Sequence, residues 1–462
     1  MKYISTRGDA APVDFLTACL AGLSPDGGLY VPESYPHIAR PEASEPYEAV
    51  AARILGAFAG DSVEPGEMAT LCKAAYGAFS HESVAPLCQI GPQRFVMELH
   101  HGPTLAFKDV AMQFIAKLFD WALARSGKRM TIVCATSGDT GGAAASAFAG
   151  AECVDLVILH PHERISPVQR LFMTTTGASN VHNLAVDGDF DDCQSIVKQL
   201  FGDKGFVEEV SLSGVNSINW ARIAAQSVYY AAAQASLGPK TPIRFIVPSG
   251  NMGDALAGYV AARCGLLSGL ELVCAVNEND ALLQVMQSGH MARSETKATP
   301  SPAMDITVPS NLERILFEAS GRDAAAISQL YASFAQSGDA IIPRTIHGPL
   351  GCMGLSAERV SSEETCAEIA RVRGETGWLI CPHTAVGTAA ARRMGLKTGT
   401  IDVVLATAHP AKFPETVEKA AGERPDLPPR CTGALSGEER FEKIDADIGA
   451  VRDRIRDVAR VE

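Results

Sequence analysis

Two glycine-rich segments with similar sequences contain residue types that suit anion binding. The two segments are Thr136-Ser137-Gly138-Asp139-Thr140-Gly141-Gly142 and Pro248-Ser249-Gly250-Asn251-Met252-Gly253-Asp254. Each follows an apolar run and precedes a run rich in small residues, which predicts a turn between a strand and a helix. Backbone N–H groups at a helix N-terminus bind phosphate or carboxylate, and glycine lets the anion approach closely. Two ordinary tight turns are the alternative, and neither segment matches GxGxxG or a P-loop.

Lys108 is the candidate nucleophile of the chain. It lies in the segment His101-Gly102-Pro103-Thr104-Leu105-Ala106-Phe107-Lys108-Asp109, between a predicted strand and a predicted helix. Apolar surroundings lower the pKa of a lysine amine and make it available for Schiff-base chemistry. A surface lysine at the start of a helix is the alternative. Pyridoxal 5′-phosphate requires both a lysine amine and a phosphate site, so the three segments together favour this cofactor.

Polar residues near other predicted elements are candidates for ligand contacts. Thr407 directly follows an apolar run, at the end of a predicted strand where open α/β sheets bind ligands. Its hydroxyl suits a ring nitrogen and the nearby Lys412 suits an anion, although a loop with a solvated lysine is the alternative. Residues 214–222 precede a predicted helix and include the cation Arg222, which suits an anionic substrate. Plain helix capping explains the same cluster equally well.

The histidines give no clear catalytic or metal-binding signal. His383 follows a predicted strand and is typical of a structural histidine in a turn. His160 and His162 flank a proline, but no third ligand stands at a recognised spacing and HExxH is absent. We therefore expect no metal site.

Alternating strands and helices must position these residues. The predicted strands are 94–99, 130–135, 154–159, 243–247, 272–276, 378–381 and 403–406. Helices are predicted at 109–125, at 142–148 and from the second glycine-rich segment through Ala262. This alternation predicts an α/β fold around largely parallel strands.

The chain divides by pattern into three parts. Residues 1–93 are predicted to be mostly helical, with helices near 15–23, 45–58 and 66–75. Residues 94–420 are predicted to form the catalytic region, with two α/β subdomains and a less regular stretch at 277–345. Residues 421–462 are predicted to be a linker and a charged C-terminal helix over 437–461.

Composition narrows the class of protein. The chain has 462 residues, of which 47% are hydrophobic, and a formal net charge of −13. A nucleic-acid or anionic-membrane binder needs a basic face, so neither partner is expected. Twelve cysteines without a CxxC pair are typical of reduced core residues, and the N-terminus has no apolar signal region. We therefore expect a cytoplasmic protein with no membrane span.

The sequence resembles the threonine synthase family. This family belongs to the fold-type II pyridoxal-phosphate enzymes, with the tryptophan synthase β chain and the serine/threonine dehydratases. The resemblance runs from Met1 to about Pro414 and includes the segments 1–8 and 22–32, which are specific because the dehydratases lack that N-terminal domain. It implies an α/β, tryptophan synthase β-like fold of type II with a mostly helical N-terminal domain.

The resemblance also implies roles for individual residues. Lys108 matches the Schiff-base lysine, Asp139 lies where relatives often carry Asn beside the pyridine 3′-oxygen, and Thr407 matches a hydroxyl against the pyridine nitrogen. The implied cofactor-binding set is Lys108, Asp139, Ser249, Gly250, Asn251, Met252, Gly253 and Thr407. Candidates for the substrate carboxylate are Thr136, Ser137 and Thr140. Candidates for the substrate phosphate are Asn216, Asn219, Arg222 and Lys412.

The activity implied by the resemblance is the conversion of O-phospho-L-homoserine and water to L-threonine and phosphate. Lys108 would remove the Cα proton and later a Cβ proton as general base. A lyase or dehydratase that gives 2-oxobutyrate is the nearest alternative, and a silent ligand-binding relative is the alternative from another class. We expect a monomer without control by S-adenosylmethionine.

Overall fold

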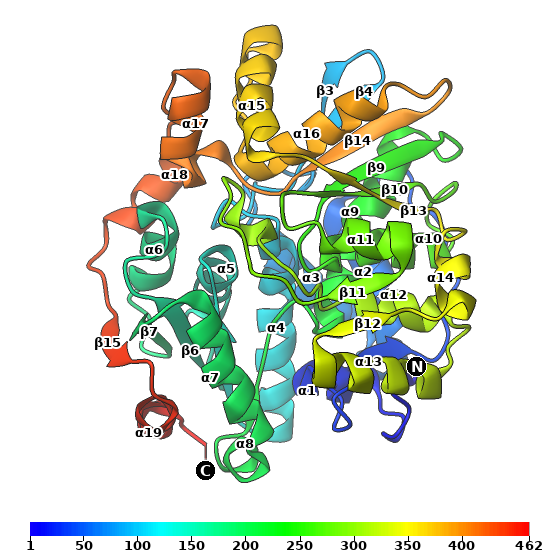
Figure 1. Cartoon of the computed structure of the whole chain (residues 1–462). Helices are drawn as coiled ribbons and strands as arrows, with labels where there is room; N and C mark the ends of the chain where they lie inside the picture. Colours follow the sequence, from blue (N-terminus) through cyan, green and yellow to red (C-terminus); the bar gives the residue numbers. More distant parts are fainter. Residues whose placement is uncertain (462) are drawn as a thin grey trace.

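Two sheets of mainly parallel strands, each covered by helices, form the two lobes of the molecule (Figure 1). The structure is a computed structural model that describes residues 1–461. The alternation of strands and helices is confirmed, but the strands divide between two sheets. No helix of the described residues is long and apolar enough to cross a lipid bilayer.

The larger sheet has six strands in the order β13-β10-β9-β14-β4-β3. These strands are Leu355–Arg359, Leu272–Val276, Ile243–Pro248, Ile401–Ala406, Arg94–Glu98 and Leu87–Gly91. All neighbours are parallel except β3 and β4, which pair antiparallel. Strands β9, β10 and β14 are buried along most of their length, as expected for the middle of a sheet covered on both faces.

The smaller sheet has five parallel strands in the order β15-β7-β6-β5-β8. These strands are Glu442–Asp445, Val181–Asp187, Val154–Pro161, Met130–Ala135 and Leu212–Ser213. Its first edge strand comes from the C-terminus of the chain, so the last residues complete a sheet that begins more than 300 positions earlier.

Helices between and around the sheets carry the residues of interest. They are α4 (Lys108–Ser126), α5 (Asp139–Phe148), α6 (Pro167–Thr174), α7 (Phe190–Gly202), α8 (Lys204–Glu209), α9 (Trp220–Leu237), α10 (Gly253–Arg263), α15 (Ser362–Thr376) and α16 (Pro382–Met394). Helix α4 runs between the two lobes and packs on α5 of one lobe and α9 of the other (Figure 1). Because twelve of its residues are buried, Lys108 at its first turn is held on a rigid element.

The N-terminal region has the helices that its sequence predicts. Its elements are β1 (Tyr3–Ser5), α1 (Phe15–Ala21), β2 (Tyr30–Pro32), α2 (Tyr47–Ala59), η1 (Gly60–Ser62) and α3 (Pro65–Tyr76). Helix α2 packs on α9 and α3 packs on α4, and their apolar residues join the main hydrophobic core. This region therefore supports the two helices that lead into the site.

The less regular stretch connects β10 to β13 and has short elements of its own. They are α11 (Ala281–Ser288), β11 (His290–Ala292), η2 (Pro302–Met304), α12 (Leu312–Ala319), α13 (Ala324–Ser337), β12 (Asp339–Ile341) and α14 (Arg344–Leu350). Strands β11 and β12 pair antiparallel. Residues 301–311 of this stretch reach the second glycine-rich segment, as described below.

Two predicted elements are wrong. Residues 378–381 are not a strand, because only three residues separate Gly377 at the end of α15 from Cys381, which caps α16. The apolar side chains there pack in a satellite core instead.

The second wrong prediction is the single helix over residues 437–461. The structure has a strand followed by a helix in this segment. The C-terminal elements are η3 (Pro410–Lys412), α17 (Pro414–Ala421), α18 (Pro429–Thr432), η4 (Ala434–Ser436), β15 and α19 (Ile448–Val458). Residues 442–445 pair with the edge of β7, and Asp447 caps α19. Backbone pairing with a distant strand outweighs the helical pattern of this charged segment.

Candidate active site

The two glycine-rich segments occupy equivalent places in the two sheets. Residues 136–142 join β5 to α5 in the smaller sheet, and we call them the first turn. Residues 248–254 join β9 to α10 in the larger sheet, and we call them the second turn. Both turns lie at the carboxyl ends of parallel strands, where open α/β sheets bind ligands. The predicted strand–turn–helix context of both is confirmed.

The first turn is organised by the Thr136 hydroxyl. Thr136 Oγ1 accepts hydrogen bonds from the N–H groups of Gly138 and Gly141, both at 2.9 Å. Gly138 has a φ of 135°, which a residue with a side chain rarely adopts. In the described chain the N–H groups of Ser137, Asp139 and Thr140 have no acceptor. The turn therefore presents free donors at the start of α5, which suits a carboxylate.

The second turn presents a longer row of free donors. The Ser249 N–H donates to Ala275 O, but the N–H groups of residues 250–254 have no acceptor within residues 1–461. Met252 precedes α10 with a left-handed φ of 60°, which turns successive N–H groups toward one side. A row of amides at a helix N-terminus is a strong site for a phosphate group.

Residues 301–311 contact the second turn and hold it in place. Ser310 Oγ donates to Asn251 Oδ1 at 3.0 Å, and the Asn311 N–H donates to Asn251 O at 3.1 Å. A Cβ added to Gly250 would stand 2.8 Å from Ala303 O, so only glycine fits there. The sequence pattern did not indicate this support, because the contacts join positions about 50 to 60 residues apart.

Lys108 faces both turns with an unbonded amine. Its side chain is 12% exposed, and its Nζ lies 3.8 Å from Asp139 Oδ2 and 4.7 Å from the centre of the Phe107 ring. Burial lowers the pKa of Lys108; Asp139 and Asp254, one from each turn, partly oppose this, whereas the cations Arg222 and Lys412 add to it. The lowered pKa increases the neutral, nucleophilic fraction of the amine.

Asp139 remains ionised although it is buried. Burial alone would raise its pKa, but Lys412 and Lys108 together hold it well below the usual range. Lys412 Nζ lies 2.7 Å from Asp139 Oδ1, and Gln169 Nε2 of α6 donates to the same oxygen at 2.9 Å. Gln169 gave no signal in the sequence, because its partner lies across the turn on another helix.

Thr407 lies beside the Lys108 segment, as its position after β14 predicts. The Phe107 N–H donates to Thr407 O at 2.8 Å, and Ala106 and Ala408 form an antiparallel bridge. The residue is buried at 4% exposure, and among the described residues no hydrogen bond uses its hydroxyl. The Thr407 hydroxyl is therefore available to a ligand held between the two turns.

The four candidates for the substrate phosphate differ in their surroundings. Asn219 is fully buried and caps α9: it donates to Cys19 O and Gly214 O and accepts from the Ala221 N–H. Arg222 donates to Val215 O, while its Nε is buried and has no partner within the described chain. Burial lowers the pKa of Arg222 to about 10, so it stays cationic at neutral pH. Within residues 1–461 the side chain of Asn216 makes no hydrogen bond.

His383 is buried next to the residues that cover the second turn. The Ala303 N–H donates to its Nε2 at 3.1 Å, so the neutral ring carries its proton on Nδ1. That Nδ1 is buried without a partner among residues 1–461, and burial lowers the pKa of His383 to about 4. The reading of His383 as a structural histidine leaves one N–H donor unexplained.

These features fit pyridoxal 5′-phosphate. The second turn offers five free amides for a phosphate, and the closeness of Gly250 to residues 303–306 leaves no room for a side chain. Lys108 offers an unbonded amine with a lowered pKa. The buried donors of Arg222 and His383 lack partners within the described residues, as expected for a site completed by a ligand.

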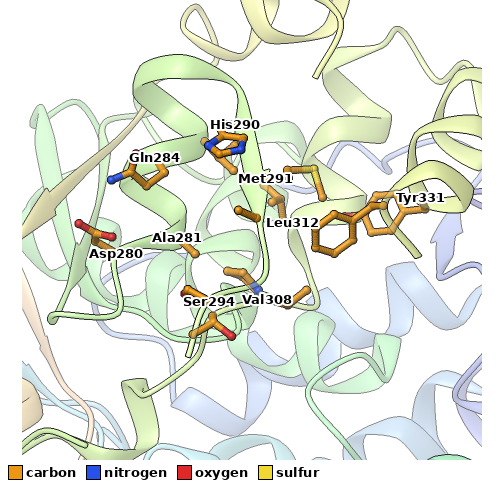
Figure 2. Close-up of a pocket in the computed structure, with 14 residues that line it drawn as sticks. Asp280, Ala281, Gln284, His290, Met291, Ser294, Val308, Leu312 and Tyr331 are labelled. Carbon is orange, nitrogen blue, oxygen red and sulfur yellow. The ribbon is translucent and has the colours of Figure 1, made fainter. Parts of the chain in front are cut away.

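A separate pocket of about 250 Å³ lies among α11, β11, α12 and α13 (Figure 2). Met291, Leu312 and Tyr331 give it an apolar wall, and Asp280 and His290 lie at its edge. It includes none of the residues of the two turns, so it is distinct from the site around Lys108. In the described part of the chain no group of three or more His, Cys, Asp or Glu residues is placed to hold a metal ion.

The fold and the site define a pyridoxal-phosphate-dependent enzyme of fold type II. The family model described as "Pyridoxal-phosphate dependent enzyme" matches residues 86–335. The models "Threonine synthase N terminus" and "Threonine synthase, C-terminal" match residues 2–76 and 384–455.

Full-length relatives narrow the class further. A threonine synthase of Pseudomonas aeruginosa is 43% identical over 458 residues, which cover 98% of this chain and 97% of that protein. The crystal structure of a PLP-bound threonine synthase from Brucella melitensis matches with a TM-score of 0.95 and 46% identity, covering 100% of both chains. Threonine synthase from yeast matches with a TM-score of 0.91 and 35% identity, covering 99% and 98%. The chain belongs to the threonine synthase family.

Proposed function

We propose that this enzyme converts O-phospho-L-homoserine and water to L-threonine and phosphate, the reaction that its family implies, with Lys108 as the reactive amine. The observation that carries the residue assignment is the position of Lys108 between two rows of free backbone donors, one on each sheet. A ligand with two anionic ends and a reactive centre between them suits this arrangement.

Pyridoxal 5′-phosphate, when bound, supplies an electron sink for a carbanion at the substrate Cα. Residues Ser249, Gly250, Asn251, Met252 and Gly253 would hold its phosphate through the backbone donors of the second turn. Asp139 and Thr407 would orient its ring, because both lie beside Lys108. A neutral hydroxyl such as that of Thr407 favours a less protonated ring nitrogen than a carboxylate does.

Lys108 would move the protons of the reaction. Its lowered pKa provides a neutral amine that accepts the Cα proton of the substrate. Once the ammonium has released that proton, the neutral amine can accept a Cβ proton. Asp139, an anion at 3.8 Å, stabilises the ammonium that results. Helix α4 fixes the amine relative to both turns, which keeps the distance to the substrate short.

The first turn would bind the substrate carboxylate. Ser137 and Thr140 add free hydroxyls to the free N–H groups, whereas the Thr136 oxygen shapes the turn and keeps its own proton to donate. For the substrate phosphate, Arg222 and Asn216 have unused donors, whereas Asn219 already caps α9. Lys412 remains a candidate for the phosphate only if it leaves Asp139.

The remaining expectations concern the protein as a whole. We propose a cytoplasmic monomer without a nucleic-acid partner; the net charge of −13 and twelve unpaired cysteines support this reading. The division of the chain into residues 1–93, 94–420 and 421–462 also remains a prediction. The C-terminal part contributes a strand to the smaller sheet and so packs with the preceding part.

A product assay tests the function. The purified enzyme is incubated with O-phospho-L-homoserine, and phosphate, threonine and 2-oxobutyrate are measured in parallel. We expect phosphate and threonine in equal amounts. Phosphate together with 2-oxobutyrate and no threonine would instead identify a lyase, and release of neither product would exclude this substrate.

A further inference from the structure

Lys412 is a fully buried cation whose ammonium contacts the first turn and the segment that contains Lys108. The residue is 0% exposed, and its ammonium lies 2.7 Å from Asp139 Oδ1 and donates to Thr104 O at 2.8 Å. It also lies 5.3 Å from the centre of the Phe172 ring. A lysine buried in this way is costly unless it is paired, so the contact with Asp139 accounts for its charge.

The two oxygens of Asp139 have different partners. Oδ1 accepts from Lys412 and Gln169, whereas Oδ2 faces the Lys108 amine at 3.8 Å. The two bonds to Oδ1 fix the plane of the carboxylate, because a carboxylate held by two donors at one oxygen cannot rotate freely. Asp139 therefore presents Oδ2 to Lys108 while Lys412 and Gln169 hold Oδ1.

We propose that Lys412 is a positioning residue that acts through Asp139: its ammonium keeps the carboxylate ionised and turned toward Lys108, and so sets how strongly the Lys108 nitrogen holds its proton beside the cofactor. The inference rests on the proposed function only in taking Lys108 as the amine that bonds to pyridoxal 5′-phosphate. It moves Lys412 from the substrate phosphate to the cofactor side of the site.

The titratable groups that face Lys108 come from five elements. Asp139 of α5 and Asp254 of α10 favour its protonated form, and Arg222 of α9 and Lys412 of η3 favour its neutral form. His383 of α16 is uncharged at neutral pH because burial lowers its pKa to about 4. Removing Asp139 should therefore lower the pKa of the Lys108 nitrogen. Because Lys412 acts through Asp139, removing Lys412 should shift this pKa mainly while Asp139 is present.

The test uses the full-length enzyme loaded with pyridoxal 5′-phosphate. The visible absorption of the bound cofactor depends on protonation of the Lys108 nitrogen and is titrated with pH in the wild type, Asp139→Asn, Lys412→Met and the double variant Asp139→Asn/Lys412→Met. Lys397→Met removes an exposed ion pair with Glu271 and is the matched control. We expect the titration midpoint to fall in Lys412→Met and further in Asp139→Asn, to be the same in the double variant as in Asp139→Asn, and to be unchanged in the control.

The expected separation between the wild type and Lys412→Met is at least about half a pH unit, a threefold change in the protonation equilibrium. Each single change leaves one buried charge unpaired, so each should lower the thermal midpoint more than the double variant does. This second readout applies even where one single variant folds poorly.

Two results would overturn the inference. One is a titration midpoint in Lys412→Met that is not lower than in the wild type, or the same shift on removing Lys412 with and without Asp139, which would mean that Lys412 does not act through Asp139. The other is a double variant less stable than either single variant. Because no substrate is present, the expected order together with a failed product assay would retain this role of Lys412 and reject only the proposed substrate.

Discussion

The first and second turns share a frame but differ in charge. Each follows a buried parallel strand and begins a helix whose first turn holds a buried aspartate, Asp139 or Asp254. Two lysines lie within 4 Å of Asp139 and hold its pKa well below the usual range despite burial. Among residues 1–461, Asp254 has only the Ser249 hydroxyl and the Ala255 N–H as hydrogen-bond partners, and burial raises its pKa to about 6.

The difference indicates how two similar segments would share one ligand in the proposed site. The first turn carries a compensated anion beside the reactive amine, which suits proton transfer. Within residues 1–461, the second turn carries five backbone amides without an acceptor, which suit a phosphate. Its carboxyl group has a raised pKa. The similar sequences of the two turns therefore reflect a similar backbone conformation. Cations from distant parts of the sequence decide which chemistry each turn supports.

The largest expected effect tests whether Lys108 joins the two turns in one site. Lys108→Ala should abolish the visible absorption of the bound cofactor and lower turnover by roughly 10²–10⁴-fold or more, because both the covalent bond and the proton transfers are lost. Absorbance and the threonine assay measure both changes. Threonine formation at the wild-type rate in this variant would end the assignment, and Lys397→Ala should leave both readouts unchanged.

The next effect concerns the opposite titration of the two aspartates. Because the pKa of Asp254 is raised from 3.8 to about 6 in the folded protein, the native state binds more protons than the unfolded state between about pH 4 and pH 6. Asp254 therefore lowers stability as pH rises through this window, by up to about 3 kcal/mol at pH 7. The pKa of Asp139 is lowered, so its contribution stabilises the protein above its unfolded pKa of about 3.9 and is lost only as pH falls further.

Urea unfolding between pH 4 and pH 7 measures this difference. Asp254→Asn should be more stable than the wild type at pH 7 and equal to it near pH 4, whereas Asp139→Asn should be less stable at pH 7. Equal stability of wild type and Asp254→Asn across the range would show that burial does not raise the pKa of Asp254.

A third prediction separates ligand binding from helix capping near the two turns. Arg222→Ala should raise the KM for O-phospho-L-homoserine by about 10- to 100-fold, the value of a charge-assisted hydrogen bond, with a much smaller effect on cofactor affinity. Asn219→Ala should instead lower the free energy of unfolding by about 1 kcal/mol with little change in KM, because Asn219 caps α9. Steady-state kinetics and thermal unfolding distinguish the two. Unchanged kinetics in Arg222→Ala would remove it from the site.

The smallest expected effect concerns the fit of the second turn. Gly250→Ala places a Cβ 2.8 Å from Ala303 O and 3.0 Å from Ile306, so the turn must shift. Overpacking of about 1–3 kcal/mol would weaken cofactor binding about 5- to 100-fold. Equilibrium titration with pyridoxal 5′-phosphate measures this loss of cofactor affinity. Gly374→Ala, in open space on α15, is the control, and equal cofactor affinity in the two variants would mean that residues 303–306 do not shape the turn.

Local patterns in the sequence were enough to predict the frame of the site. The strands before both turns, the helices after them and the place of Lys108 at a helix start all depend on residues next to one another in the chain. The predicted strand at 378–381 was wrong, because these residues lie between the ends of two helices. The predicted helix over 437–461 was wrong, because part of it pairs with β7 as a strand.

Long-range contacts explain what the sequence could not predict. Asp139 meets Gln169 of α6 and Lys412 beyond β14, and Ser310 supports Asn251 across an irregular connection. None of these pairs has a fixed spacing, since each depends on how the two sheets are arranged in space. The charge state of Asp139, and with it the difference between the two turns, is therefore a property of the folded chain alone.

The most direct test of the account identifies the lysine that bonds to the cofactor. The enzyme loaded with pyridoxal 5′-phosphate is reduced with borohydride, digested and analysed by mass spectrometry. We predict a single pyridoxyl group, on the peptide that contains Lys108, and an unmodified Lys412. A pyridoxyl group on Lys412 or on any other lysine, with Lys108 unmodified, would contradict the account.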